Sequence, residues 1–315
     1  MNWKKTKNGV LVPPDIVPVK VRARYDAAQT TSENTRHWSY ADALSPNEAN
    51  SIAVRAALRN RARYEIANNT YAKGIILTIA NDVIGTGPRL QLMLGDNDEA
   101  KAMSADLEAQ WRAWADEIDL AGKLRTMRMA KAGDGEAFAV LTTNPKLESQ
   151  VKLDIQLFEA EQIATPYGLS SYLEEQVDGI NFDAYGNPVS YYVFTVHPGS
   201  VGYSSNYVRV PAASMIHWYR ADRPGHHRPV PEITSALPLF ALLRRYTLAE
   251  VTAAETAANF AAVLKVQPAN EEDVDIEPMV SFDLERNMVT TVPGELAQIK
   301  AEHPATTYPE FKKEL

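Results

Sequence analysis

A proline-rich loop that leads directly into a long alanine-rich segment constrains this fold more than any other feature of the chain. Loop and segment together span residues 219–264. Pro224, Pro229 and Pro231 fix the backbone angle φ and lack an N–H donor, so they cannot lie inside a sheet or a helix. The loop must therefore be a series of turns, and we expect a helix to begin only after it, at Leu237.

The residues that follow Leu237 have a helical pattern. Apolar side chains recur at helical spacing, at Phe240, Leu243, Tyr246 or Thr247, Val251, Ala254 and Ala258. A second set has small side chains that let another backbone approach closely: Ala253, Ala257, Ala261 and Ala262. We expect a helix over 237–264 with close neighbours, and we interpret the region as an architectural joint and not as an active site.

The composition indicates a folded protein with an acidic balance. Hydrophobic residues make up 45% of the 315 residues, and the formal net charge is −8. That charge argues against coating nucleic acid through bulk electrostatics, because phosphate binding needs clustered cations. The absence of cysteine excludes disulfides and thiolate catalysis. No stretch approaches the roughly 18 apolar residues of a membrane span, and the start lacks the apolar core of a signal peptide, so we expect assembly in a cytoplasm without membrane contact.

The first part of the chain is predicted to be helical. Residues 1–38 mix proline, threonine, serine and charges without a sustained period, and we expect an extended arm. Ser45 is a candidate N-cap, with Pro46 at the first helical position and Glu48 three residues after the cap. This pattern predicts a helix from Pro46 to about Asn68.

Further helices and one strand are expected next. A helix over 70–83 should stop at the Gly-Thr-Gly-Pro turn at 85–88, and the alternation in residues 89–94 predicts a strand. Helices are expected over 98–117 and 124–132. They carry apolar residues at a spacing typical of core: Met103, Leu107, Trp111, Trp114, Met127 and Met129.

The middle of the chain is predicted to be mostly β-structure. The Gly-Asp-Gly turn at 133–135 should end a helix and lead into a strand over 137–141. Further strands are expected at 153–157, 177–182 and 189–196, with one or two more within 207–218. Helices, then strands, then one long helix is an α+β order and not a repeating βαβ order.

One enzyme hypothesis rests on His217, Asp222, His226 and His227, because imidazoles and a carboxylate can hold a transition metal that activates water. Such a site would make the chain a metal-dependent hydrolase. The spacing weighs against it: adjacent histidines on a proline-braced loop point apart more easily than together, and no helical pair places two ligands on one face.

Two other motifs contain residue types that occur in catalytic or nucleotide-binding sites. Asp134 and Glu136, flanked by glycine, could form a general acid/base pair, although such a turn is more often a helix stop followed by a strand. The glycines at 85 and 87 lack the Gly-Lys-Ser/Thr ending of a phosphate loop, so the sequence offers no nucleotide site.

A DNA-binding hypothesis rests on four arginines of the first predicted helix: Arg55, Arg59, Arg61 and Arg63. They could face phosphate groups and make the chain a DNA-binding module. The alternative is a solvated or subunit-facing helix, which is the more usual role of such a charge run.

Several blocks, in order, resemble one protein family. They are RARYEIANNTYAKGIILTIANDVIGTGPRLQ, WRAWADEIDLAG, MRMAKAGDGEAFAVL, QLFEAEQI, VDGINFDAYGNPVSYYVF, VPAASMIHWYR and RPGHHRPVPEITSALPLFALLRRYTLAEVTAAETAANFAA. The chain resembles the portal proteins of tailed bacteriophages, in the lambdoid branch, from about Tyr40 to about Phe311. The number and order of these blocks carry the resemblance, since each alone is weak.

The resemblance implies a structural role in the virion and no catalytic residue, cofactor or metal. It implies a ring of about twelve copies at one capsid vertex, through which a terminase motor drives double-stranded DNA during packaging and through which DNA is later ejected. The implied partners are the terminase large subunit, head-completion or connector proteins, and the major capsid and scaffolding proteins.

The resemblance also divides the chain into parts. It implies an N-terminal arm at 1–38, a wing domain at 39–236 and a stem helix at 237–264. A clip at 265–304 would dock partners, and 305–315 would begin a second stem helix.

Some residues acquire expected roles from this division. Arg244, Arg245 and Lys265 would lie near the DNA channel. The clip would contain an acidic partner-docking loop, whose alternative is a solvated loop: Glu271, Glu272, Asp273, Asp275 and Glu277. Arg228 would anchor the proline loop through hydrogen bonds to carbonyls or a carboxylate.

The sequence departs from the family pattern in two places. Family members continue well past Leu315, so the resemblance implies a chain truncated within the second stem helix, with the apolar face of 237–264 poorly covered. In addition, Pro229 stands where the family has glycine, which affects the local turn.

Overall fold

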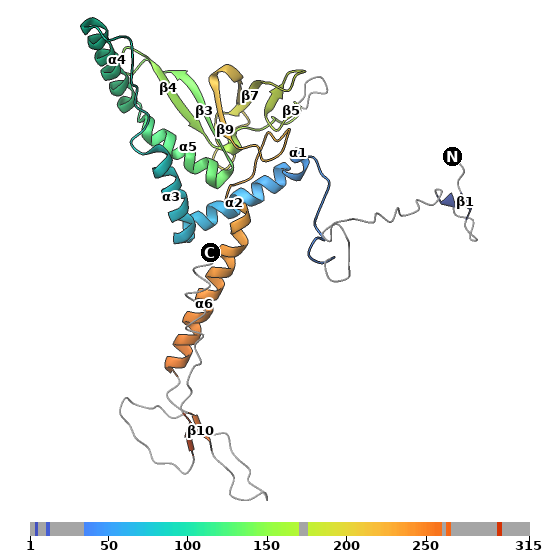
Figure 1. Cartoon of the computed structure of the whole chain (residues 1–315). Coiled ribbons are helices and arrows are strands. Elements are labelled where there is room, and N and C mark those ends of the chain that lie inside the picture. The colour runs from blue at the N-terminus through green and yellow to red at the C-terminus, as the bar shows by residue number, and fades with distance from the viewer. Residues whose placement is uncertain are drawn as a thin grey trace, which may run out of the picture. The chain divides into compact units, whose positions relative to one another are not determined.

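The computed structural model describes residues 35–169 and 176–259, together with four short strands (Figure 1). The chain divides into two compact units, Met1–Ser45 and Pro46–Leu315. The short strands form two antiparallel pairs, β1 (Lys4–Lys5) with β2 (Leu11–Val12) and β10 (Val263–Lys265) with β11 (Glu295–Ala297). Most of the expected arm and clip, the acidic residues at 271–277 and all of 305–315 lie outside the described residues.

The helix expected from Pro46 is divided in two, α1 (Pro46–Ala49) and α2 (Ile52–Asn68). The break lies at Ser51, whose backbone is not helical, with φ −54° and ψ 162°. A tertiary contact favours the break, because the side chain of the adjacent Asn50 lies 2.6 Å from the ring nitrogen Nε2 of His226.

The next three helices confirm most of the predicted boundaries. In α3 (Thr70–Ile84), the Asn69 side chain accepts a hydrogen bond from the Tyr71 N–H, and Gly85, with φ 54°, follows the last residue. After α4 (Asp98–Glu117), the chain turns at Asp119 in the left-handed conformation and continues as α5 (Leu120–Asp134). No described helix is long and apolar enough to cross a membrane.

The prediction of a strand at 89–94 is wrong for the isolated chain. Its residues belong to no helix or strand, because a strand needs a partner strand for its backbone groups and none lies beside this segment in the described ranges.

Apart from the two short pairs, the β-structure of the described residues consists of two antiparallel sheets. One has the order β4-β3-β9, from β3 (Glu136–Thr143), β4 (Leu153–Phe158) and β9 (Met215–Tyr219). The other has the order β5-β6-β7-β8, from β5 (Gln176–Val177), β6 (Ile180–Phe182), β7 (Pro188–Phe194) and β8 (Tyr207–Pro211). The single strand expected at 177–182 is instead a tight hairpin, with φ 39° at Asp178 and 84° at Gly179. Helices with antiparallel sheets confirm the α+β class.

Three apolar clusters hold these elements together. The first packs α4 and α5 against the β4-β3-β9 sheet and contains Trp114 and Met127, as their spacing predicted. The second lies between the two sheets around Phe138, which is buried; burying a phenylalanine contributes roughly 1.5–3 kcal/mol. The third joins α2, α3 and α5 to the start of the last long helix through Ile233 and Leu237.

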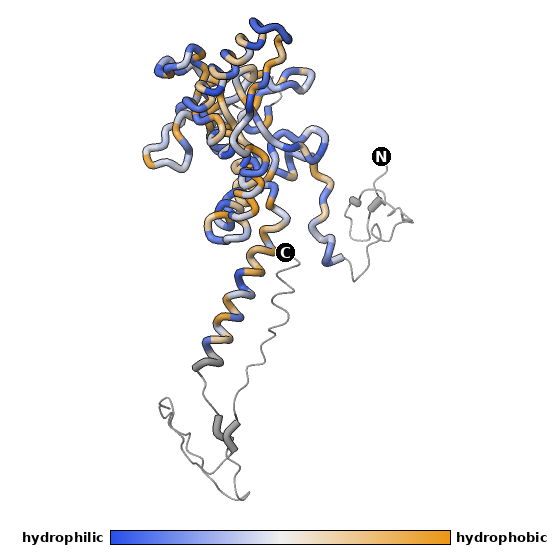
Figure 2. The backbone as a smooth tube through the Cα atoms, turned by 60° about the vertical axis from the view of Figure 1, so that its left-hand side comes forward, coloured by the Kyte–Doolittle hydropathy of each residue, from blue (hydrophilic) through white to orange (hydrophobic). Residues whose placement is uncertain are grey.

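The last long helix, α6 (Leu237–Asn259), begins where the sequence predicted and extends away from the other elements (Figure 1). Leu237, Phe240 and Leu243 are buried, whereas Leu248 and Val251 further along are exposed. Apolar and polar residues continue to alternate along the projecting part (Figure 2). The helix predicted to reach 264 is described to Asn259, and residues 263–265 belong to β10.

Candidate functional site

The junction between α5 and β3 places one carboxylate under the proline loop. Gly135 ends α5 in the left-handed region, with φ 95°. A Cβ at this position would lie 2.5 Å from the carbonyl carbon of Val230, so only glycine lets the loop pass this close. Glu136, the first residue of β3, is therefore held directly beneath the loop.

Arg228 of the loop binds this carboxylate in the protein interior. Its Nε and Nη2 atoms donate to Glu136 Oε2 and Oε1, each at 2.8 Å. The remaining N–H groups donate to the carbonyl oxygens of Ile163, Asp178 and Ala160. Arg228 is 1% exposed. This confirms the expected anchoring, and the full set of partners is what a buried guanidinium requires.

The ionic state of Glu136 follows from its neighbours. Burial by itself would raise its pKa, but the charge of Arg228 and a hydrogen bond with His217 outweigh burial and lower the pKa to about 2. Burial raises the pKa of Asp134, although the Arg63 guanidinium binds it. Glu136 is sealed from solvent, so the two residues form no general acid/base pair, and the hypothesis that they do is wrong.

Three arginines of α2, spaced four residues apart on one helix face, complete a buried network. Arg55 binds Asp178 and the Asn50 carbonyl, and Arg59 lies 3.4 Å from Glu136 and 3.1 Å from Glu161. Arg63 binds Asp134 through two hydrogen bonds of 2.7 and 3.0 Å. We call this set the ionic joint: Arg55, Arg59, Arg63, Asp134, Glu136, Glu161, Asp178 and Arg228.

The ionic joint corrects the hypothesis of a DNA-binding module on α2. Arg55 and Arg59 are each 4% exposed and already paired with carboxylates, so phosphate groups cannot reach them. Arg63 is half-buried among carboxylates. Arg61 alone of the four is exposed and lies off this face.

The four residues of the metal hypothesis are not brought together. His217 Nε2 donates to the carboxylate of Glu136 at 3.1 Å, and the ring stacks between Phe138 and Tyr219. His226 hydrogen-bonds with Asn50, and His227 packs on Phe182. Asp222 pairs with Arg220 at the surface. Each of the four side chains therefore contacts a different partner, and together they do not form a metal site.

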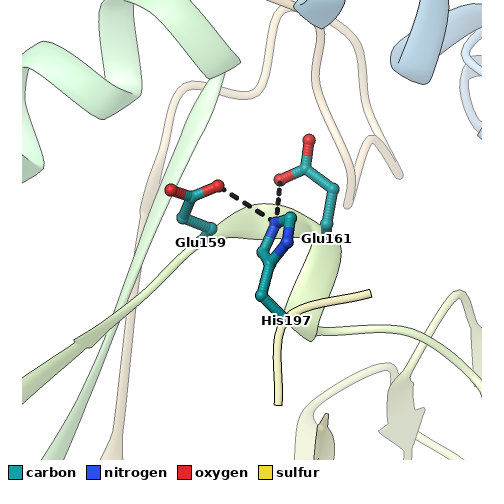
Figure 3. A group of neighbouring side chains, drawn as sticks. All are labelled: Glu159, Glu161 and His197. Carbon is teal, nitrogen blue, oxygen red and sulfur yellow. Dashed lines mark ion pairs between the residues drawn. The ribbon is translucent and has the colours of Figure 1, made fainter. Parts of the chain in front are cut away.

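A different group has the spacing of metal ligands: Glu159, Glu161 and His197, whose ligand atoms lie within 4.8 Å of one another (Figure 3). Its chemistry does not suit a cation. His197 Nδ1 accepts a hydrogen bond from the Gly199 N–H, so in the neutral ring the proton must sit on Nε2, the atom that faces Glu159. Arg63 also lies 3.3 Å from Glu159 and 3.1 Å from Glu161 and pairs with both carboxylates.

Further ion pairs tie the end of the loop and α6 to the helices. Glu232 binds Lys131 at 2.6 Å and Arg128 at 3.0 Å, both on α5. Arg244 on α6 lies 2.6 Å from Glu65 and over the ring of Tyr64, both on α2. The loop and the first turns of α6 are therefore held in one orientation to the sheets and helices.

Comparison of the sequence with known protein families shows the family of this chain. Residues 31–315 match the family described as phage portal protein, lambda family. The chain belongs to the lambda family of phage portal proteins. This confirms the resemblance that the sequence blocks indicated and gives the chain a structural role in the phage virion, within a ring that works with capsid and genome-packaging components. No curated protein matches the chain.

The sequence pointed to the arginines of this portal protein's ionic joint and to Asp134 and Glu136, two of its four acidic residues. Glu161 and Asp178 were not singled out. For Asp178 a signal existed, because Asp-Gly is a common two-residue hairpin turn and such a turn would have divided the predicted strand at 177–182. No local signal in the sequence distinguishes Glu161 from the other acidic residues of the chain.

Proposed function

We propose that this portal protein forms a ring of about twelve copies around a channel through which double-stranded DNA is packaged and ejected. The family match over residues 31–315 carries the proposal. On this reading the terminase large subunit, head-completion or connector proteins, and the major capsid and scaffolding proteins bind the ring. The acidic net charge of −8 suits a passage that does not adhere to DNA.

The exposed half of α6 supports a role as a stem helix that lines or supports this channel. Residues 251–255 are exposed around the whole circumference of the helix, and Leu248 is 61% exposed. Such apolar surface mixed with small alanines is favourable when neighbouring copies cover it. The division into wing at 39–236, stem at 237–264 and clip at 265–304 belongs to the same proposal.

The channel-facing and docking residues also remain proposals. Arg245 is exposed on α6 and is the better channel candidate, because Arg244 already binds Glu65. Lys265 ends β10. The acidic residues at 271–277 would bind terminase or connector proteins.

Mass measurement in solution tests the proposed function. Size exclusion coupled to light scattering, with negative-stain images, should show a species near the mass of about twelve subunits with a central hole. A stable monomer at every concentration tried would contradict the proposal. The histidine-loop hydrolase is not a second candidate, since its four residues lie apart.

A further inference from the structure

A pocket of about 310 Å³ lies where the two sheets meet. Its walls come from β6 and β7 of one sheet, from β9 of the other and from the proline loop. Half of the residues that line it carry aromatic rings: Phe182, Tyr191, His217, Tyr219 and His227. No lysine, arginine or carboxylate side chain is among the described residues of its walls. Small-ligand sites in proteins start at about 300 Å³, so the pocket can take one small organic group.

Two tyrosine hydroxyls at this pocket have no protein partner. Tyr191 packs against Phe138 between the sheets and is 4% exposed. Within residues 35–169 and 176–259, its hydroxyl has no hydrogen-bond partner, and the same holds for the hydroxyl of Tyr219. A buried phenol usually finds a partner for its hydroxyl group. A polar ligand in the pocket would therefore satisfy groups that the fold leaves unpaired.

The rings behind the pocket form a stacked column. His217 lies 4.2 Å from Phe138 and 4.3 Å from Tyr219 between ring centres, with interplanar angles of 17° and 27°. The guanidinium carbon of Arg228 lies 5.3 Å from the ring centre of Phe138. The faces of aromatic rings carry partial negative charge and attract cations. The fold thus already places one cation against this column, and Tyr219, at the other end of the column, lines the pocket.

The electrostatics of the walls favour a cation over an anion. Burial raises the pKa of Tyr191 to about 12 and lowers the pKa of His217, so neither side chain is charged at neutral pH. Glu136 lies directly across the strand pair from Tyr219. Burial raises the pKa of Tyr219, and the negative charge of Glu136 raises it further. An anion would find no positive charge in these walls, whereas a cation meets ring faces and phenol oxygens.

We propose that this pocket binds an alkylguanidinium or alkylammonium group, the chemistry of an arginine or lysine side chain and of small free amines. The ring faces stabilise the charge, and the hydroxyl oxygens of Tyr191 and Tyr219 accept hydrogen bonds from the N–H groups. All of the lining residues belong to one subunit. The site is therefore separate from the proposed channel and does not depend on ring assembly.

Protection of an introduced thiol tests the proposal, because the chain contains no cysteine of its own. Met215→Cys and, in a second protein, Pro188→Cys place a thiol on the pocket wall, and circular dichroism checks that both variants fold. Butylguanidinium chloride at about 10 mM should slow alkylation by iodoacetamide at least about threefold, which corresponds to a Kd of about 5 mM or below. Butylurea has a similar shape without the charge and should give no protection.

A thiol at an exposed site away from the pocket controls for effects on the reagent. Val201→Cys, at a fully exposed position, should react at the same rate with either compound. Equal protection of the pocket thiols by butylurea would overturn the preference for a cation. No protection by butylguanidinium in either pocket variant would overturn the site itself.

Tyrosine substitutions in the Met215→Cys protein assign the binding groups. Tyr191→Phe keeps the ring and removes the hydroxyl, so it should weaken protection, and Tyr219→Ala removes a ring face as well and should abolish it. The matched control is Tyr192→Phe, because neighbouring side chains of a strand point to opposite faces. Protection that survives unchanged in Tyr219→Ala, or that falls equally in Tyr192→Phe, would overturn the assignment.

Two peptides distinguish the sources of the cation. The test compares an acetylated and amidated Ala-Arg-Ala tripeptide with the same peptide that carries uncharged citrulline in place of arginine. Stronger protection by the arginine peptide than by butylguanidinium would support a protein side chain, and the reverse order would support a small free amine. Equal protection by the citrulline peptide would overturn the proposal. Protection in a protein that forms no ring would support the pocket and contradict only the proposed function.

Discussion

Arg228 and Glu136 are 92 positions apart in the sequence and form a two-pronged ion pair in the interior of this portal protein. The pair fixes the proline loop onto the junction of α5 and β3. Through that loop it also fixes where α6 starts, because only eight residues separate Arg228 from Leu237 at the start of the helix. The joint is thus a tertiary anchor for the helix that we propose as the stem.

Replacing Arg228 should strongly destabilise the fold. Arg228→Ala leaves Glu136 charged and buried, which typically costs about 3–5 kcal/mol. Arg228→Lys should recover little of this lost stability, because a lysine cannot hydrogen-bond to both carboxylate oxygens and to three carbonyl groups at the same time. Urea unfolding of the purified proteins measures the stability of both Arg228 variants. The control is Arg220→Ala, which removes the surface pair with Asp222 and should leave the unfolding midpoint nearly unchanged; similar losses in the two alanine variants would contradict a special role for Arg228.

Stability should fall at acidic pH because of Glu136. Its pKa is lowered from 4.5 to about 2 in the fold. The unfolded chain therefore binds the proton first, so this contribution to stability is complete above pH 4.5 and is lost as the pH falls toward about 2. The raised pKa of Asp134 acts in the opposite direction. Urea midpoints measured across this window should decline less steeply for Glu136→Gln than for wild type; parallel declines would show that other groups cause the acid sensitivity.

The contact of α6 with α2 should appear as a measurable coupling. Arg244 and Glu65 are 2.6 Å apart and partly shielded from solvent. A double-mutant cycle with Arg244→Ala and Glu65→Ala should give a coupling free energy of about 0.5–1 kcal/mol. The same cycle with Arg245→Ala, whose side chain is exposed, serves as the control and should give none. Additive effects of the Arg244 and Glu65 changes would mean that α6 is held by apolar contacts alone.

Substitutions on the two halves of α6 should have different consequences. Leu248→Glu changes an exposed residue and should leave subunit unfolding unchanged while it prevents ring formation, since a charge would be buried between neighbours. Leu243→Ala removes a buried residue and should destabilise the subunit by about 2–5 kcal/mol. Light scattering and urea unfolding separate the two effects. Rings of normal mass from Leu248→Glu would argue against α6 as an inter-subunit helix.

Metal ions should not stabilise the protein through Glu159, Glu161 and His197. Arg63 already pairs with the two carboxylates, and the histidine presents its N–H to Glu159. Thermal unfolding with added Zn²⁺ or Mn²⁺, and after chelation, should give the same midpoint. A rise with metal that disappears in His197→Ala would instead identify a binding site, because a ligand that binds the folded state raises its stability.

The sequence by itself determined the features that depend on local backbone chemistry. Three prolines exclude a helix from the loop that precedes Leu237, Pro46 is the first residue of α1, and Gly85 and Gly135 follow the last residues of α3 and α5 with positive φ. Residue patterns with a short period also located most strands. These outcomes follow from steric limits and hydrogen bonding within a few residues, and they hold wherever the segment lies.

The tertiary structure alone decided which charges meet. Arg55 and Arg59 have the same local surroundings as solvated arginines of a helix, and only the fold places Asp178, Glu136 and Glu161 against them. Likewise the alternation at 89–94 indicates a strand, but a ladder needs a second strand, and none of the strands in 35–169 and 176–259 pairs with this segment. Pairing depends on contacts between residues far apart in the sequence, and local pattern carries no information about the partner's position.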